Sequence, residues 1–293
     1  MNNTIIVAID GGIASEAALH WAAEWARSVQ LDLELCTIAD LAWSPENERL
    51  LLPAYQRVLD AAVGEIAELA GPVRVTATLR HGNPTAELIG GSRSAALLVI
   101  GTHKTSRLAG LIHGTLPLKV AAETVCPLVV VPATWTTSSG PVVVGVDDDT
   151  DHRAIDFAAD AARRLGEPLL LVHAWDVPST VATDFLGRGD LYESMRDGNA
   201  ALLTKVAGRL RRAHDGLTVT ERLVYGNPAI ALSEAAEGAS LAVVGTHHRR
   251  AIAGMILGSV SHDILMNMPC PIAVVPPGQL TTGSTDVVEV QPS

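Results

Sequence analysis

Leu98-Val99-Ile100-Gly101-Thr102-His103 decides the fold, because the chain contains this stretch twice. The second copy is Ala242-Val243-Val244-Gly245-Thr246-His247. Each copy continues to a Gly that is followed by Thr or Ser (a Gly-hydroxyl pair), then to a Cys-Pro pair and to an apolar run that ends in Pro. These segments are Gly114-Thr115, Cys126-Pro127 and Val129–Pro132 in the first copy, and Gly258-Ser259, Cys270-Pro271 and Ala273–Pro276 in the second. Every counterpart lies 144 residues later (245 minus 101), so the chain contains an internal repeat.

Each copy has the layout of a strand, a loop, a helix and a further strand. A continuous apolar run such as 96–100 is typical of a strand buried on both faces of a parallel sheet. The Gly-hydroxyl pair opens the next helix, and the first N–H groups of a helix have no internal partners and attract anions. Phosphates are usually bound at such a loop, at the carboxyl end of parallel strands. The repeat therefore predicts two anion-binding sites.

Strand-like and helix-like segments alternate along the rest of the chain. The expected strands are 4–9, 31–39, 72–79, 96–100 and 129–132, then 141–147, 169–174, 217–224, 242–245 and 273–276. The expected helices include 16–29, capped by Ser15, 54–69 after a loop over 40–53, and 85–90, then 152–165 and 191–214. Such alternation predicts the α/β class: two similar five-stranded parallel sheets, doubly wound and Rossmann-like, in tandem.

The pattern also predicts the boundaries of the domains. We expect one domain over 1–133, a polar linker over 134–140, a second domain over 141–277 and a flexible tail over 278–293, which is rich in Thr, Gly and Ser. Asp147 follows Asp10 by 137 residues rather than 144, so the second domain has seven more residues between its first and third strands. We expect most of them in the loop over 176–190.

Composition excludes several classes of protein. The net charge is −11 and the 21 Lys and Arg residues are scattered, which argues against a nucleic-acid partner. The start of the chain lacks the features of a signal peptide, and no run has the length of a membrane span, so we expect a cytoplasmic protein without a membrane partner. Cys126 and Cys270 read as packing residues, with a redox or metal pair as the alternative, and no spacing indicates a metal cluster.

In combination, these features resemble two copies of the universal stress protein domain, which together cover nearly the whole chain. The resemblance rests on Asp10 with Gly11, on Asp147, on the two Gly-Asn-Pro turns at 82–84 and 226–228, and on the repeated glycine loops and Cys-Pro endings. Nucleotide-binding members of this family hold ATP in a loop of the form Gly-x2-Gly-x9-Gly-Ser/Thr. The resemblance therefore implies ATP as the ligand. The acids that surround Asp147 make Mg²⁺ a candidate companion ion, because this cation prefers carboxylate and phosphate oxygens.

Carried over by position, the resemblance implies a set of nucleotide-binding residues in each copy: acids near the ribose and phosphates, turn glycines, and loop residues at the phosphates. These are Asp10, Gly11, Gly82, Gly101, Gly114 and Thr115 in the first copy, and Asp147, Gly226, Gly245, Gly258, Ser259 and Ser261 in the second. Members of the family pair through their last strand. Segments 127–132 and 271–276 are therefore expected to join the copies as a pseudo-dimer within one chain, and a further homodimer stays open.

The chain departs from the family loop at the second glycine, where it has Lys104 and His248. A side chain there obstructs the phosphates if φ must be positive, although Lys104 would add a cation. The first copy has Pro117 where the second has Ser261, and only Ser261 offers a hydroxyl and an N–H. We therefore expect the second copy to be the better phosphate site. The acids around Asp147 oppose this unless Mg²⁺ intervenes.

Several roles stay open at this point. Asp10 and Asp147 are either ligand contacts or helix caps. His103 and His247 hydrogen-bond either within their loops or to a ligand. The Gly-Asn-Pro segments are either simple turns or the floor of an adenine pocket.

Three functions remain. The first is a regulatory protein of the stress response that binds an adenine nucleotide. The second is a slow ATPase, against which stands the lack of a positioned base, an arginine finger or a Walker-type Lys. The third is an interaction module whose nucleotide pockets have decayed.

Overall fold

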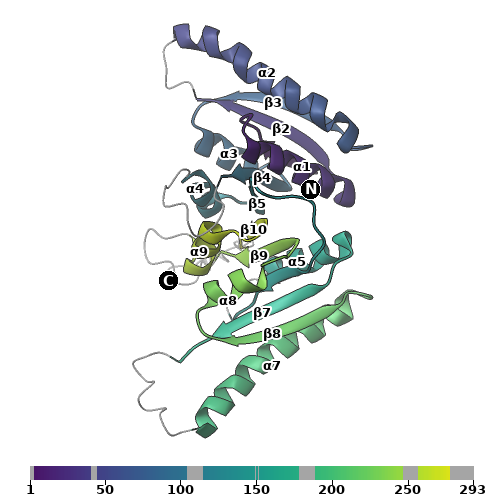
Figure 1. Cartoon of the computed structure of the whole chain (residues 1–293), viewed down its shortest axis with the longest axis vertical. Coiled ribbons are helices and arrows are strands. Elements are labelled where there is room, and N and C mark those ends of the chain that lie inside the picture. Colours follow the sequence, from purple (N-terminus) through teal and green to yellow (C-terminus); the bar gives the residue numbers. More distant parts are fainter. Residues whose placement is uncertain are drawn as a thin grey trace, which may run out of the picture.

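The computed structural model describes residues 3–40, 45–103, 115–148, 150, 152–177, 189–246 and 257–277. Within them the strands form one ten-stranded sheet in the order β3-β2-β1-β4-β5-β10-β9-β6-β7-β8 (Figure 1). The strands are β1 Thr4–Ala8, β2 Asp32–Ala39, β3 Val75–His81, β4 Leu97–Thr102, β5 Leu128–Pro132, β6 Val142–Gly145, β7 Leu169–Trp175, β8 Val219–Tyr225, β9 Leu241–Gly245 and β10 Ile272–Val275.

Each half of this sheet is parallel, and the two halves meet in one antiparallel pair. In the N-terminal half all neighbouring strands from β3 to β5 run parallel, and the same is true from β10 to β8 in the C-terminal half. At the seam, β5 pairs with β10 so that Val130 faces Ile272 and Leu128 faces Val274. The prediction that the last strands join the two copies is confirmed, and the two parallel sheets are halves of one continuous sheet.

Helices cover both faces of the sheet (Figure 1). They are α1 Ile13–Val29, α2 Pro45–Leu69, α3 Pro84–Ser92, α4 Leu116–Glu123, α5 His152–Leu165, α7 Gly189–Ala213, α8 Pro228–Ala235 and α9 Ser259–Asn267. One apolar core lies under α1, α2, α5 and α7, and a second lies under α3, α4, α8 and α9. Adjacent strand residues alternate between them, as Ile5 and Ile6 do. Each core runs through both halves, so the molecule folds as one layered body.

Two predicted helix starts are wrong. Helix α1 begins at Ile13 after an N-cap at Gly12, and Ser15 is not its cap, because its hydroxyl donates to the carbonyl of Gly12 at 2.9 Å. Helix α2 begins at Pro45 and contains Pro53, where we expected a loop. A proline inside a helix removes one hydrogen bond and costs about 3 kcal/mol. The apolar face of α2 that is buried in the core offsets this cost.

The extra residues of the second half lie where the sequence placed them. Segment 176–188 connects β7 to α7, whereas the shorter segment 40–44 connects β2 to α2. Strand β3 begins at Val75, three residues later than expected. None of the described helices is both long and apolar enough to cross a membrane. The expected tail over 278–293 lies outside the described residues.

Aromatic side chains join the halves beside the seam. Trp21 and Trp25 of α1 stack with ring centroids 5.3 Å apart, and Trp25 also stacks on Phe157 of α5 at 6.0 Å. The linker is fixed to the same helix, because Thr137 donates a hydrogen bond to Glu24 at 2.6 Å and Trp135 packs against the core. The linker therefore lies against α1 instead of separating the two halves.

We predict that Trp25 and Phe157 stabilise the protein jointly. Aromatic pairs contribute about 0.5–1.5 kcal/mol beyond the area that they bury. A double-mutant cycle of Trp25→Leu and Phe157→Leu, measured by urea unfolding, should give a coupling free energy in this range. Additive effects of the two substitutions would show that the ring contact between the halves contributes nothing.

Candidate functional site

The carboxyl ends of the parallel strands open at one point in each half. Strand β1 lies between β2 and β4, and β6 lies between β7 and β9, so the chain leaves neighbouring strands in opposite directions there. In doubly wound sheets, ligands bind in the crevice formed at such a point. A cavity lies at this place in both halves.

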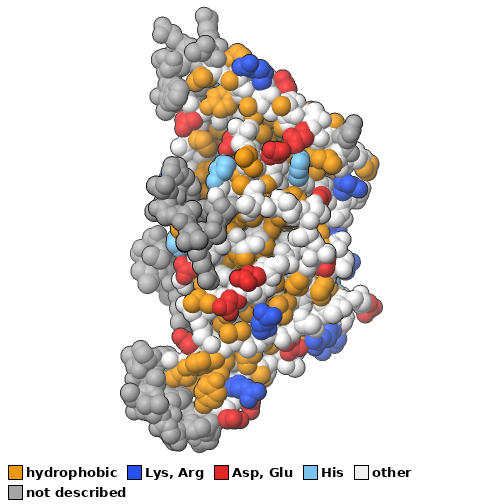
Figure 2. Space-filling view, viewed as in Figure 1, with side chains coloured by type: hydrophobic (Ala, Val, Ile, Leu, Met, Phe, Trp, Pro, Cys, Tyr) orange, Lys and Arg blue, Asp and Glu red, His pale blue; other side chains and the backbone are white. Residues whose placement is uncertain are grey.

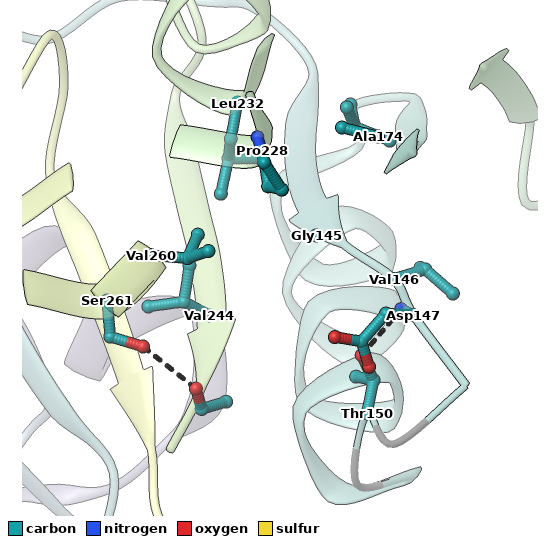
Figure 3. A pocket seen from close by; sticks show the side chains of 12 residues that line it. Gly145, Val146, Asp147, Thr150, Ala174, Pro228, Leu232, Val244, Val260 and Ser261 are labelled. Atoms are coloured by element: carbon teal, nitrogen blue, oxygen red, sulfur yellow. Dashed lines mark hydrogen bonds between the residues drawn. The ribbon is translucent and has the colours of Figure 1, made fainter. Parts of the chain in front are cut away.

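The cavity of the C-terminal half has a volume of about 80 Å³. In Figure 3 Asp147 and Thr150 lie on one side of it and Val260 and Ser261 on the other. The remaining lining residues are mostly apolar and come from the end of β6 and the residue after it, from β7 and β9, and from helix α8: Gly145, Val146, Val172, Ala174, Pro228, Leu232, Val244 and Gly245. The structure thus brings the predicted residues Asp147, Gly245 and Ser261 together around one apolar cavity.

The cavity of the N-terminal half is built from the equivalent positions and measures about 200 Å³. Its lining residues are Ala8, Ile9, Asp10, Ser15, Cys36, Ile38, Pro84, Leu88, Ile100, Gly101 and Leu116. The predicted residues Asp10 and Gly101 meet here. Binding sites for whole small molecules usually measure about 300–1,000 Å³. Both cavities are smaller, so each can enclose only part of a nucleotide.

The acids at the strand ends are held by local hydrogen bonds. The Oδ1 atom of Asp10 accepts from the N–H of Gly12 at 2.8 Å, while the side chain stays exposed. Asp147 is half-buried: its Oδ1 accepts from the hydroxyl of Thr150 at 2.9 Å, and its own N–H donates to the same hydroxyl oxygen at 2.7 Å. Thr150 therefore fixes Asp147 more firmly than Gly12 fixes Asp10.

Helix α9 points its N-terminus at the cavity of the C-terminal half. Its N-cap, Gly258, makes no side-chain hydrogen bond, and the first N–H that bonds back to the cap is that of His262. The N–H groups of residues 259–261 therefore precede the first hydrogen bond to the cap. The buried hydroxyl of Ser261 donates to the carbonyl of Gly245 at 2.9 Å, so it ties α9 to β9 (Figure 3). Only the N–H groups, not the hydroxyl proton, remain to bind an anion.

Helix α4 offers fewer donors in the N-terminal half. Thr115 is its exposed N-cap, and the N–H of Lys119 is the first to bond back to it. Pro117, at the second helical position, has no N–H, so the first turn retains the donors of Leu116 and Leu118 only. The first turn of α9 therefore has one more main-chain donor than that of α4, and the better phosphate site in the second copy stays a prediction.

The Gly-Asn-Pro segments are turns that also shape the cavities. Gly82 and Gly226 have φ of 133° and 139°, which other residues rarely adopt. Asn83 and Asn227 cap the helices that follow, with side-chain oxygens that accept from main-chain N–H groups at 2.9–3.2 Å. The prolines that come next, Pro84 and Pro228, line the cavities. These segments are therefore turns whose prolines also line the cavities, while their role as the floor of an adenine pocket stays a prediction.

Gly101 has a steric role that Gly245 does not share. A Cβ atom at Gly101 would lie 2.0 Å from the carbonyl oxygen of Ala14, because the start of α1 crosses β4 there. A Cβ atom at Gly245 would make an ordinary contact of 3.5 Å with Ala154. Glycine at position 101 is therefore required for the packing of α1.

The other predicted residues are not all placed at these cavities. Gly11, with φ of 82°, lines a neighbouring cavity between α1 and α2 together with Arg57 and Glu65. Ser259 is the exposed first residue of α9. Gly114, Lys104, His247 and His248 lie outside the described residues, as do Asp149 and Asp151. In the described part of the chain, no group of three or more His, Cys, Asp or Glu residues could hold a metal ion.

The three cysteines are free and buried. Burial raises the pKa of Cys36 and of Cys126 to about 11, and that of Cys270 to about 12. Thiols react as thiolates, so all three are inert at neutral pH. Cys126 and Cys270 belong to the apolar core under α4 and α9, in agreement with their interpretation as packing residues.

Sequence reasoning missed most of the cavity walls. Ile38 and Ala174 line the cavities from the ends of β2 and β7, and Thr150 fixes Asp147. His173 was also missed: it is buried, with Nδ1 2.7 Å from the carbonyl oxygen of Val146 and Nε2 2.8 Å from Oδ1 of Asn199. The strand register, once known, would have identified the first two, because they follow the residues that pair with β1 and β6.

A sequence model described as the universal stress protein family matches residues 1–132 and 139–276. The chain is 27% identical over 290 residues to a universal stress protein of Mycobacterium tuberculosis strain H37Rv, covering 92% of this chain and 96% of that protein. It is 28% identical over 297 residues to one of Mycolicibacterium smegmatis, covering 93% and 97%.

The fold is similar to that of solved structures of the same description. A universal stress protein from Archaeoglobus fulgidus DSM 4304 has a TM-score of 0.69 at 16% identity, covering 95% of this chain and 100% of that chain. A protein from Pseudomonas aeruginosa UCBPP-PA14, described as a putative universal stress protein, has a TM-score of 0.70 at 16% identity, covering 94% and 93%. At this identity the likeness shows the fold alone.

We predict different effects on stability for alanine at the two equivalent glycines. Gly101→Ala should lower the free energy of unfolding by about 3 kcal/mol, because α1 must move away from β4. Gly245→Ala is the matched control and should change it by less than about 0.5 kcal/mol. Urea denaturation followed by circular dichroism measures both. Equal effects would contradict the close approach of α1.

We also predict that alkaline pH destabilises the fold through the buried thiols. An unfolded thiol ionises near pH 9, whereas the folded ones keep their protons to about pH 11–12. The contribution of the buried thiols to the free energy of unfolding is complete below pH 9 and is lost as pH rises through these values. The unfolding free energy of a variant with Cys126→Ala and Cys270→Ala should fall less steeply from pH 9 to pH 11. If the unfolding free energies of the variant and the wild type fall in parallel with pH, the buried thiols do not cause the loss of stability.

Proposed function

Since the chain belongs to the universal stress protein family, we propose that it binds an adenine nucleotide, ATP in the first instance, and acts as a nucleotide-dependent regulatory protein of the stress response. The observation that carries this proposal is the repeated cavity at the switch point of each half-sheet. In both halves an acid at the end of the first strand, an apolar wall and the first turn of a helix line the same cavity.

The chemistry of the lining suits the parts of a nucleotide. The apolar walls, such as Ala174 and Leu232, would take the flat base, and Asp147 would accept hydrogen bonds from ribose hydroxyls. The phosphates would lie outside the small cavity, over the N–H groups that begin α9. The same roles fall to Ile38, Asp10 and the start of α4 in the other half.

Charge favours the C-terminal cavity only in part. Helix α9 offers three N–H groups before its first hydrogen bond to the cap, against two in α4. Asp148, however, is an exposed acid next to Asp147 and would repel a triphosphate. A Mg²⁺ ion shared between phosphate oxygens and these carboxylates would relieve that repulsion. We therefore propose that the C-terminal cavity binds Mg²⁺-ATP more tightly than the N-terminal one.

Hydrolysis is not favoured by any observation on the described residues. The described lining of the C-terminal cavity supplies one carboxylate, that of Asp147, and two hydroxyl groups, but no Lys, Arg or His. Phosphoryl transfer needs a positioned base and cations at the phosphates. Our proposal is therefore binding with release of intact nucleotide.

Mass spectrometry of the gently purified protein tests the proposal directly. Retained ATP would support it, and rapid conversion of added ATP to ADP would indicate an ATPase instead. Protein that carries no nucleotide, and whose thermal midpoint does not move with added ATP, ADP, AMP or cyclic AMP, would indicate an interaction module.

We predict that one main-chain donor separates the affinities of the two cavities. Ser261→Pro gives α9 the residue that α4 has at Pro117 and removes both the hydroxyl and the N–H, whereas Ser261→Ala removes the hydroxyl alone. A hydrogen bond to a charged group contributes about 1.5–3 kcal/mol. Isothermal titration should therefore show ATP binding to the C-terminal cavity at least about tenfold weaker in Ser261→Pro than in Ser261→Ala. Equal affinities would rule out phosphate binding at this helix.

A further inference from the structure

Buried His173 bridges the end of β6 to helix α7. Its side chain is only 6% exposed, and its ring lies between the carbonyl of Val146 and the amide of Asn199. A main-chain carbonyl can only accept, so Nδ1 carries a proton and donates to Val146 at 2.7 Å. Val146 lines the C-terminal cavity and directly precedes Asp147. The ring therefore holds the main chain that presents this acid.

Asn199 connects the ring to α7. Its Oδ1 lies 2.8 Å from Nε2 of His173, and its Nδ2 donates to the carbonyl of Met195 one turn earlier, also at 2.8 Å. Because Nδ1 donates to Val146, Nε2 accepts from the amide nitrogen of Asn199 in a neutral ring and donates to the amide oxygen in a ring with protons on both nitrogens. Cavity wall, ring and helix are thus linked by two hydrogen bonds.

An aromatic cluster of Trp175, Tyr192 and Tyr225 fixes the start of α7. The ring of Tyr192 lies 5.2 Å from that of Trp175 and 5.8 Å from that of Tyr225, and the last two are 5.2 Å apart. Trp175 is buried, while Tyr192 and Tyr225 are exposed. Apolar side chains gather at the lower end of the molecule (Figure 2), where α7 and β8 lie. Asn199 lies two turns further along this helix, so α7 offers the ring of His173 a fixed partner.

At the equivalent described positions, the N-terminal half has other side chains. Cys36 pairs with Ala8 as Val172 pairs with Gly145, so Thr37 occupies the place of His173. The place of Asn199 is taken by Tyr55 (199 minus 144). The Thr37 hydroxyl is buried and has no hydrogen-bond partner in the described part of the chain. Ala39 and His81 stand in the register of Trp175 and Tyr225.

We propose that His173 and Asn199 are positioning residues of the C-terminal ligand cavity. They hold the Val146 carbonyl, and with it the Asp147 carboxylate, in the orientation that receives the ligand before the ligand arrives. Ordering a site in advance removes the cost of ordering it on binding. The proposal rests on the proposed nucleotide binding and adds that the two cavities differ in preorganisation.

Binding of ATP to domain-matched variants tests the role. His173→Thr, which installs the residue of the other half, and Asn199→Leu should each weaken the C-terminal site by about tenfold. Asn199→Asp places a carboxylate at Nε2, where it accepts from a ring with protons on both nitrogens, and should restore most of the affinity lost in Asn199→Leu. Thr37→Val, the matched control in the N-terminal half, should leave the C-terminal site unchanged. An equal loss in Thr37→Val, or none in Asn199→Leu, would overturn the proposal.

A measurement without ligand separates this proposal from nucleotide binding itself. The N–H of Asp147 donates to Thr150, and its hydrogen exchange reports how well this segment is held. The exchange should be faster than in the wild type in His173→Thr and Asn199→Leu, and close to the wild-type rate in Asn199→Asp. Exchange in β9 should stay constant. Wild-type protein that binds no nucleotide would refute the proposed function. Unchanged exchange in both His173→Thr and Asn199→Leu would refute the positioning role. If His173→Thr fails to fold, the comparison of Asn199→Leu with Asn199→Asp decides.

Discussion

The antiparallel pairing of β5 with β10 is the constraint on which the arrangement of the molecule depends. Both strands are buried on both faces, so their paired segments contain only apolar residues from Leu128 to Val131 and from Ile272 to Val275. Joining the sheets there removes two open edges and makes each apolar core continuous between the halves. It also brings helices α4 and α9 into contact (Figure 1). The helices whose N-termini point at the two candidate sites are therefore neighbours.

The repeat has preserved the architecture while its two cavities have diverged. Both keep an acid at the end of a strand, a proline from the Gly-Asn-Pro turn and a helix start. In the N-terminal half, Gly101 serves the packing of α1, and Pro117 replaces a donor. In the C-terminal half, Thr150 and His173 hold the segment around Asp147 from both sides. Among the described residues, more side-chain hydrogen bonds thus hold the segment around Asp147 than the segment around Asp10.

The sequence predicted what depends on pattern and missed what depends on packing. Alternating strands and helices and the fixed spacing of 144 were sufficient for the class and the tandem arrangement. The seam was predicted only from the resemblance to a family whose members pair through their last strand. Pro53 misled the prediction of α2, because packing outweighed the local preference against proline. Residues such as His173 and Asn199 carried no signal, since they come together only through the register of β7 and the packing of α7. Ser261 was predicted as a ligand group, yet its hydroxyl is used to join α9 to β9.

The central claim is that each half-sheet ends in a cavity for an adenine nucleotide, and that the cavity beside Asp147 is the better formed. A crystal structure of the protein with Mg²⁺ and a non-hydrolysable ATP analogue, at a concentration that fills only the tighter site, tests this most directly. We predict the base among Val172, Ala174 and Leu232, with the phosphates over the start of α9. Nucleotide bound elsewhere, for example in the cavity between α1 and α2 next to Arg57, or only in the N-terminal half, would contradict the account.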